Sequence, residues 1–444
     1  MTRHLSSFHW SVPVIVLTVA CSSSKETPAQ ASGGAAGAAA GPAATMGGAS
    51  STGGAASAGI PAVSGGASGT PSVSNGGTSV IGAGGGVPGA SGTSSTGGAN
   101  SGGSAGTTSP PPGDAGPLVV PVPLPDGNGG IGFDDLLYSP VLKKLIAPAG
   151  RTGDVDLVDP ITLAVTVLGG FSKTTMFTLG KHRSGSTSAD VDGSGHSLYA
   201  IDNETKTVRV VDLATKMITF TTMLAAAPDY ARFIATTNEL WVSGPNNPGV
   251  TASANPGIEI FTLPAGAAPV HAALVPISNG PEGMAVDNQR KRVYTDSFQG
   301  KTYSVDMASR TVVETWSNGC PGLTVDLQLD EARGFVMVPC ATPGRVAVLD
   351  AGHGGKMLGE LSTGSGVDVC AYNATLHHFY MAGQTSADLS IVGISAAGVP
   401  TLLGKVPTTM GSQMVAADEL GNAWVGDPGG GRLLKIRDTY PASD

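Results

Sequence analysis

The sequence predicts an all-β fold, a seven-bladed β-propeller, from the spacing of a repeat and from the residues that fill it. One strand-turn-strand unit recurs seven times between about residues 133 and 438. A repeat in the low forties that contains only short strands and turns has the length of one four-stranded propeller blade. The residues that close the first hairpin of each unit lie 53, 43, 52, 43, 43 and 45 positions apart, at Ser139, Asp192, Ala235, Asp287, Asp330, Asn373 and Asp418.

The fourth unit shows the strands of one blade clearly. Residues 283–287, 292–296, 302–306 and 311–316 are short runs rich in β-branched and aromatic residues, separated by turn-forming residues. Such runs are typical of the strands of a meander. In four units an aspartate ends the third strand, where its side chain is expected to accept hydrogen bonds from the following turn: Asp159, Asp212, Asp306 and Asp350.

The repeat units resemble the YVTN family of β-propeller repeats. Segments 195–202 and 208–215 carry the pattern, L-Y-A-I-D followed by V-R-V-V-D-L-A-T, and the resemblance covers residues 131–438. It implies a propeller of a surface or periplasmic protein. Relatives in fold include lactonases and other hydrolases, so the resemblance by itself assigns no activity.

Residues 118–124 are a candidate closing strand for the ring. The seventh unit shows three clear strands before residue 438. The segment 118–124 combines valine and leucine with two prolines, and proline is tolerated in edge strands. We expect this segment to supply the outermost strand of the seventh blade.

Residues 1–20 resemble the signal peptide of a bacterial lipoprotein. Their apolar stretch, residues 12–20, is much shorter than the ~20 apolar residues of a spanning helix. The letters T-V-A-C resemble a lipobox, with threonine in place of the usual leucine. The resemblance implies that Cys21 is lipidated, and that Ser22 directs the protein to the outer membrane. The alternative is an ordinary signal peptide, cleaved near Ala20, that leaves a soluble secreted protein.

Residues 21–116 are predicted to be a disordered linker. Residues 27–113 contain no charged and no aromatic side chain, so they cannot bury enough apolar surface to offset the entropy lost on ordering. Between a lipid at Cys21 and a folded domain at residues 117–444, this linker would hold the domain away from a membrane. The alternative is a spacer that does nothing but link.

The cysteines beyond Cys21 also favour an exported protein. Cys320 precedes the first strand of the fifth unit and Cys340 ends the second, so both lie at the same end of one hairpin. A disulfide is predicted between them, with two separate buried thiols as the alternative. Cys370 lies in an inner strand and is predicted to be an inert core residue.

The charge of the chain argues against nucleic acid as a partner. The formal net charge is −9, only 13% of the residues are charged, and no basic segment is present. We expect membrane contact only through the N-terminal lipid.

The loops that enter the inner strands are the expected ligand-binding face, because they surround the central channel of a propeller. Carboxylates among them suit a cation such as calcium, with Glu282 and Asp368 as candidate metal ligands. The alternative is a solvated rim without a site. The candidate ligand-binding residues are Asp134, His182, Tyr230, Arg232, Glu282 and Asp368, and the same loops carry Asp135, Arg183, Asp229 and Gln413.

Two functions from different classes follow. The favoured one is an envelope-anchored binding or scaffolding module for another envelope protein or an extracellular ligand. The alternative is a calcium-dependent, lactonase-like hydrolase with its site in the central channel, where Glu282 resembles a calcium ligand. The sequence has no G-x-S-x-G nucleophile motif, and His377 and His378 would point to opposite faces of a strand. An enzyme is therefore the less favoured interpretation.

Overall fold

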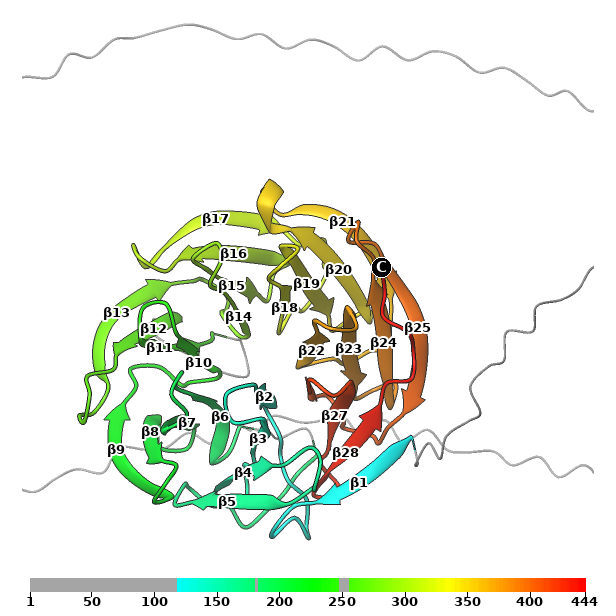
Figure 1. The fold of residues 1–444 in the computed structure, drawn as a ribbon. Coiled ribbons are helices and arrows are strands. Elements are labelled where there is room, and N and C mark those ends of the chain that lie inside the picture. The colour runs from blue at the N-terminus through cyan, green and yellow to red at the C-terminus, as the bar shows by residue number, and fades with distance from the viewer. Residues whose placement is uncertain (1–117, 180–182, 247–254) are drawn as a thin grey trace, which may run out of the picture. The chain divides into compact units, whose positions relative to one another are not determined.

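The computed structural model describes residues 118–179, 183–246 and 255–444. The predicted signal peptide, the predicted linker with Cys21, and the candidate residue His182 lie outside these residues. Within them the chain forms seven four-stranded sheets around a central axis (Figure 1). The prediction of an all-β, seven-bladed propeller is confirmed.

In blades one to six, the strands follow one another in chain order from the channel outward. Blades one to three are β2 (Leu137–Ser139), β3 (Lys144–Pro148), β4 (Asp154–Val158) and β5 (Val165–Gly169); β6 (Ser186–Val191), β7 (Ser197–Asp202), β8 (Thr207–Asp212) and β9 (Met217–Met223); β10 (Ala231–Ile234), β11 (Glu239–Gly244), β12 (Gly257–Thr262) and β13 (Val270–Pro276). Blades four to six are β14 (Met284–Asp287), β15 (Arg292–Ser297), β16 (Lys301–Asp306) and β17 (Thr311–Ser317); β18 (Gln328–Asp330), β19 (Phe335–Cys340), β20 (Arg345–Asp350) and β21 (Lys356–Ser362); β22 (Cys370–Asn373), β23 (His378–Gly383), β24 (Asp388–Ile394) and β25 (Pro400–Pro407).

Blade seven joins the two ends of the described chain. It contains β26 (Val415–Ala417), β27 (Asn422–Asp427) and β28 (Arg432–Arg437), and β1 (Val119–Pro123) is its outermost strand (Figure 1). β1 pairs antiparallel with β28 over its whole length. The predicted closing strand is confirmed, and its prolines lie on the edge of the sheet, where a missing backbone N–H is tolerated.

The predicted disulfide is also confirmed. Cys320 and Cys340 form a disulfide with a Cα–Cα distance of 5.4 Å. Cys370 is a free, buried thiol at the start of β22. The disulfide therefore ties the loop before blade five to the end of β19.

The aspartates that end the third strands cap the turns that follow them. Oδ1 of Asp159 accepts the backbone N–H of Thr162 at 2.8 Å, and Oδ1 of Asp212 accepts that of Thr215 at 2.7 Å. Asp306 and Asp350 make equivalent bonds, and Asp350 caps the short 3-10 helix η1 (Ala351–His353). Because these carboxylates are committed to local turns, their predicted structural role is confirmed.

The hydrophobic core lies between neighbouring blades. Ile146 of blade one and Leu198 of blade two belong to one buried cluster, and Ile201 of blade two and Leu240 of blade three belong to the next. Each blade is therefore held by its neighbours, which makes the ring a rigid frame for the channel. Among the described residues, no helix is long and apolar enough to cross a membrane.

Candidate ligand-binding site in the central channel

Polar side chains gather where the chain enters the inner strands. These strands occupy equivalent places in the blades and start at the same end of the channel, so the residues before them converge. They are Asp134 and Asp135 before β2, Arg183 before β6, Asp229 and Tyr230 before β10, Glu282 before β14, Asp326 before β18, Asp368 before β22 and Gln413 before β26.

At this end, four carboxyl groups surround one guanidinium group. Nη2 of Arg183 lies 2.9 Å from Oδ2 of Asp229 and 2.8 Å from Oε1 of Glu282. Burial would lower the pKa of Arg183, but Asp229, Asp134, Glu282 and Asp368 outweigh it and raise that pKa. We call these five residues the entry cluster. Three of the predicted site residues, Asp134, Glu282 and Asp368, therefore come together around an arginine.

Glu282 is the most unusual acid of the entry cluster. Its side chain is almost completely buried, and its Oε2 has no hydrogen-bond partner in the described structure. Burial raises the pKa of Glu282 well above its ordinary value, and Asp229 and Asp368 raise it further, while Arg183 acts in the opposite direction. The cluster therefore holds more negative charge than Arg183 alone neutralises, and Glu282 is the member that favours its proton.

Among the residues that the structure describes, the entry cluster does not have the arrangement of a metal site. Within the ranges that the structure describes, no group of three or more His, Cys, Asp or Glu side chains is placed to hold a metal ion. Instead, Glu282 bonds to the Arg183 guanidinium. Calcium binding by Glu282 and Asp368 remains a sequence-based prediction.

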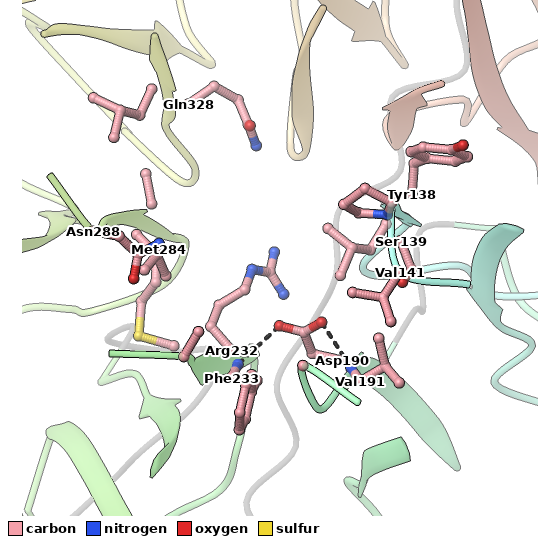
Figure 2. A pocket seen from close by; sticks show the side chains of 17 residues that line it. Tyr138, Ser139, Val141, Asp190, Val191, Arg232, Phe233, Met284, Asn288 and Gln328 are labelled. Atoms are coloured by element: carbon pink, nitrogen blue, oxygen red, sulfur yellow. Dashed lines mark hydrogen bonds between the residues drawn. The ribbon is translucent and has the colours of Figure 1, made fainter. Parts of the chain in front are cut away.

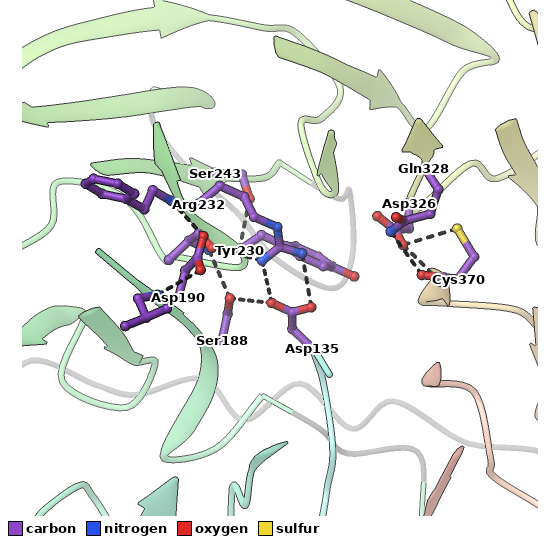
Figure 3. A network of polar contacts seen from close by, with 12 residues as sticks. Asp135, Ser188, Asp190, Tyr230, Arg232, Ser243, Asp326, Gln328 and Cys370 are labelled. Atoms are coloured by element: carbon purple, nitrogen blue, oxygen red, sulfur yellow. Dashed lines mark hydrogen bonds and ion pairs between the residues drawn. The ribbon is translucent and has the colours of Figure 1, made fainter. Parts of the chain in front are cut away.

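A second ion pair crosses the channel next to the entry cluster (Figure 3). Nη1 of Arg232 lies 2.6 Å from Oδ2 of Asp135, and Nη2 lies 3.1 Å from Oδ1, so the pair is bidentate. Ser188 donates to the same carboxylate at 2.6 Å, and the guanidinium lies 5.3 Å from the ring centre of Tyr230. Tyr230 is buried in the core. Two of the predicted site residues, Tyr230 and Arg232, thus belong to this buried contact, and ligand binding by them remains a sequence-based prediction.

Asp326 lies across the channel from this pair. Its Oδ2 accepts the backbone N–H of Cys370 at 2.9 Å and faces the Cys370 thiol at 3.3 Å (Figure 3). Burial raises the pKa of Asp326 to about 6 and the pKa of the Cys370 thiol well above its ordinary value. A Cβ at Gly283 would lie 2.1 Å from Oδ1 of Asp326, so only glycine leaves room for this carboxylate.

The channel opens into a pocket of about 350 Å³ at its other end, where the first hairpin of each blade turns. We call this pocket the funnel. It is bounded by side chains from blades one to five. Figure 2 shows the Asp190 carboxylate and the Arg232 guanidinium facing the same central space, with the Gln328 amide pointing toward it from the opposite side. Val141, Phe233 and Val286 are among the apolar residues of its wall.

Asp190 and Gln328 were not among the residues selected from the sequence. Both lie within inner strands, β6 and β18, rather than in the loops that enter them. A signal was present for Asp190, because it is the one charged residue in a strand of mostly small residues. Side chains alternate along a strand, so such a residue faces the channel when its neighbours face the sheets beside it.

Comparisons with known proteins show the fold alone. No family model and no curated protein matches the chain. Solved structures do match. A chain of the Kuenenia stuttgartiensis hydrazine synthase has a TM-score of 0.58 and 15% identity, over 70% of this chain and 96% of that one. A chain of the mitotic checkpoint complex has a TM-score of 0.55 and 13% identity, over 77% and 100%.

A third match is the β-propeller domain of Cps50 (Swd1) from Myceliophteria thermophila. Its TM-score is 0.55 at 13% identity, over 70% of this chain and 98% of that domain. The chain is a seven-bladed propeller. At these identities the likeness does not extend to activity, and the resemblance to YVTN repeats remains a sequence-based prediction.

Proposed function

We propose that this protein is an envelope-anchored binding module and that its ligand enters the funnel of the propeller. The funnel is the observation that carries the proposal. Its volume of about 350 Å³ falls within the usual range of small-molecule pockets, ~300–1,000 Å³. Five blades build its wall, so it belongs to the rigid frame rather than to one mobile loop.

The opposite end of the channel, where the entry cluster lies, also favours the funnel as the binding face. Arg183 and Arg232 bind carboxylates across the channel, and both are largely buried. Ligand groups at that end would have to separate paired charges, which is costly in a buried site. The funnel needs no such rearrangement.

The anchor in this proposal rests on the sequence. The apolar stretch before Cys21, the lipobox-like letters and the uncharged linker support a lipid-tethered protein of the outer membrane. A Cys21→Ala variant should therefore move from the membrane fraction to the soluble envelope fraction and lose incorporation of a labelled fatty acid. An unchanged distribution without lipid labelling in the wild type would contradict the anchor and leave the binding proposal standing.

Binding at the funnel can be tested by placing a photoreactive residue at its mouth in the full-length protein. Val141 lines the funnel and is 48% exposed, whereas Val313 on the outer strand β17 is 45% exposed and serves as a matched control. We expect discrete crosslinked products in cells from position 141 and none from position 313. Equal labelling at the two positions, or none at either, would contradict binding at the funnel.

A further inference from the structure

We infer that the funnel binds a primary alkylammonium group, on a free amine or on a lysine side chain, with Asp190 as its counter-ion. The inference rests on the proposed function and adds the chemical class of the ligand. It is carried by the charge at the closed end of the funnel, by the fixed orientation of the acceptors there, and by the apolar wall.

The closed end of the funnel has an excess of negative charge. Asp190 and Arg232 line the funnel, and the carboxyl groups of Asp135, Asp190 and Asp326 all act on the Arg232 guanidinium, which makes its bidentate ion pair with Asp135. Within the described residues neither Asp190 nor Asp326 forms an ion pair. This charge disfavours a carboxylate or phosphate ligand and favours a cation.

The acceptors are held in place by the backbone. The two oxygens of Asp190 accept the N–H groups of Val191 at 2.7 Å and of Phe233 at 2.8 Å. Each oxygen keeps a second lone pair for a ligand. Across the funnel, Nε2 of Gln328 donates to the Cys370 carbonyl at 3.0 Å, which leaves Oε1 as an acceptor. The free lone pairs of Asp190 suit the N–H donors of an ammonium group, and the Gln328 amide faces the same space from the opposite side.

The wall of the funnel suits an alkyl chain. Val141, Phe233 and Val286 are among the apolar residues that line the funnel. A ligand with an apolar stem and a charged end would bury its stem there and leave its ammonium at the carboxylate, as lysine side chains do at apolar surfaces. Burial raises the pKa of Asp190 to about 6 despite the opposing effect of Arg232, so the carboxylate is ionised at neutral pH and protonated below it.

The test is calorimetric titration of the full-length protein with three ligands of equal chain length: pentylamine, 1-pentanol and pentanoate. We expect pentylammonium to bind about tenfold or more tightly than pentanol at pH 7.5, the gain of one charge-assisted hydrogen bond, and pentanoate not to bind. That preference should disappear at pH 5 in the wild type. Equal binding of amine and alcohol, a preference for pentanoate, or a preference unchanged at pH 5 would overturn the inference.

Variants and a second ligand pair complete the test. Val286→Lys would place its own ammonium in the funnel and should abolish pentylammonium binding, whereas Val286→Leu should retain it. A peptide that contains one lysine, compared with the same peptide containing norleucine, distinguishes a protein ligand from a free amine. Crosslinking at position 141 without any pentylammonium binding would refute the ammonium assignment and keep the binding module. If neither crosslinking at position 141 nor binding of pentylammonium is observed, both proposals are refuted.

Discussion

Glu282 is a carboxyl group buried among other carboxyl groups, and this position makes its charge costly. Its pKa is raised by burial, by Asp229 and by Asp368. The folded state therefore keeps a proton that the unfolded state releases near pH 4.3. The free energy of unfolding of the wild type falls as the pH rises above that value, because the folded state then binds more protons than the unfolded state. Glu282→Gln removes the titration and retains a carbonyl oxygen for Arg183. At pH 8 the variant should be more stable than the wild type by about 1 kcal/mol.

The measurement is urea unfolding of wild type and variant between pH 4 and pH 8. The difference in free energy of unfolding should shrink toward zero at pH 4, where both proteins carry a neutral group. Glu360→Gln is the control, because Glu360 is an exposed partner of Arg345 and lies outside the channel. A Glu282→Gln variant that is less stable than the wild type at pH 8 would show that the ionised form supports the fold. Dependence of the wild type on calcium, lost in the variant, would favour the metal-binding alternative.

Arg232, in contrast to Glu282, is expected to stabilise the fold through its charge, because its guanidinium is paired with the Asp135 carboxylate. Replacing it by methionine leaves Asp135 buried without its bidentate partner, and such losses cost roughly 3–5 kcal/mol. Adding Asp135→Asn to Arg232→Met should recover part of the loss, since an amide needs no counter-ion. A double-mutant cycle of chemical denaturation measures this coupling. Additive losses would mean that the two side chains do not stabilise one another.

At the scale of elements, the segment after β28 fastens the end of the chain to blade six. His378 is buried, with Nδ1 2.7 Å from Oδ2 of Asp438 and Nε2 3.0 Å from the carbonyl of Pro441. Tyr380 donates to the same carboxylate at 2.7 Å. Both ring nitrogens of His378 therefore lie within hydrogen-bond distance of oxygen atoms from the segment after β28.

This contact predicts acid-sensitive stability. Burial would raise the pKa of Asp438, but hydrogen bonds from His378 and Tyr380 lower it below its ordinary value. Because the pKa of Asp438 is lower in the folded state than in the unfolded state, the carboxylate stabilises the fold. This stabilisation is complete above the pKa of the unfolded state, about 3.9, and is lost as the pH falls through the pKa of the folded state. Asp438→Asn should lose about 2 kcal/mol at pH 7, and the difference should shrink below pH 4. Thermal melts check this, with the exposed Asp444→Asn as control; equal melting of all three proteins at pH 7 would contradict it.

At the scale of the molecule, the period and the strand pattern predicted the ring, because every blade repeats a local sequence rule. The closing strand was also predictable, since an edge strand tolerates prolines. The ion pairs of the channel were not. Arg183 and Glu282 are 99 positions apart, and Arg232 and Asp135 are 97 apart. Their loops were identified, but the partner of each charge depends on how blades face one another across the channel, which no local pattern records.

Closure of the ring by β1 gives the last prediction, which concerns the cooperativity of the whole propeller. Deleting residues 118–124 from the full-length protein removes the outermost strand of blade seven and leaves β28 with an unpaired edge. Val122, which is only 3% exposed, would be lost from the core shared by blades one and seven.

Such an edge is a template for pairing with another chain. We therefore expect a lower melting temperature and concentration-dependent association by light scattering. A deletion of residues 101–107 is the matched control, because it removes the same length from the predicted linker and should change neither property. If the two deletions melt alike and both remain monomeric, β1 contributes no closure, and blade seven is stable as a three-stranded sheet held by its neighbours alone.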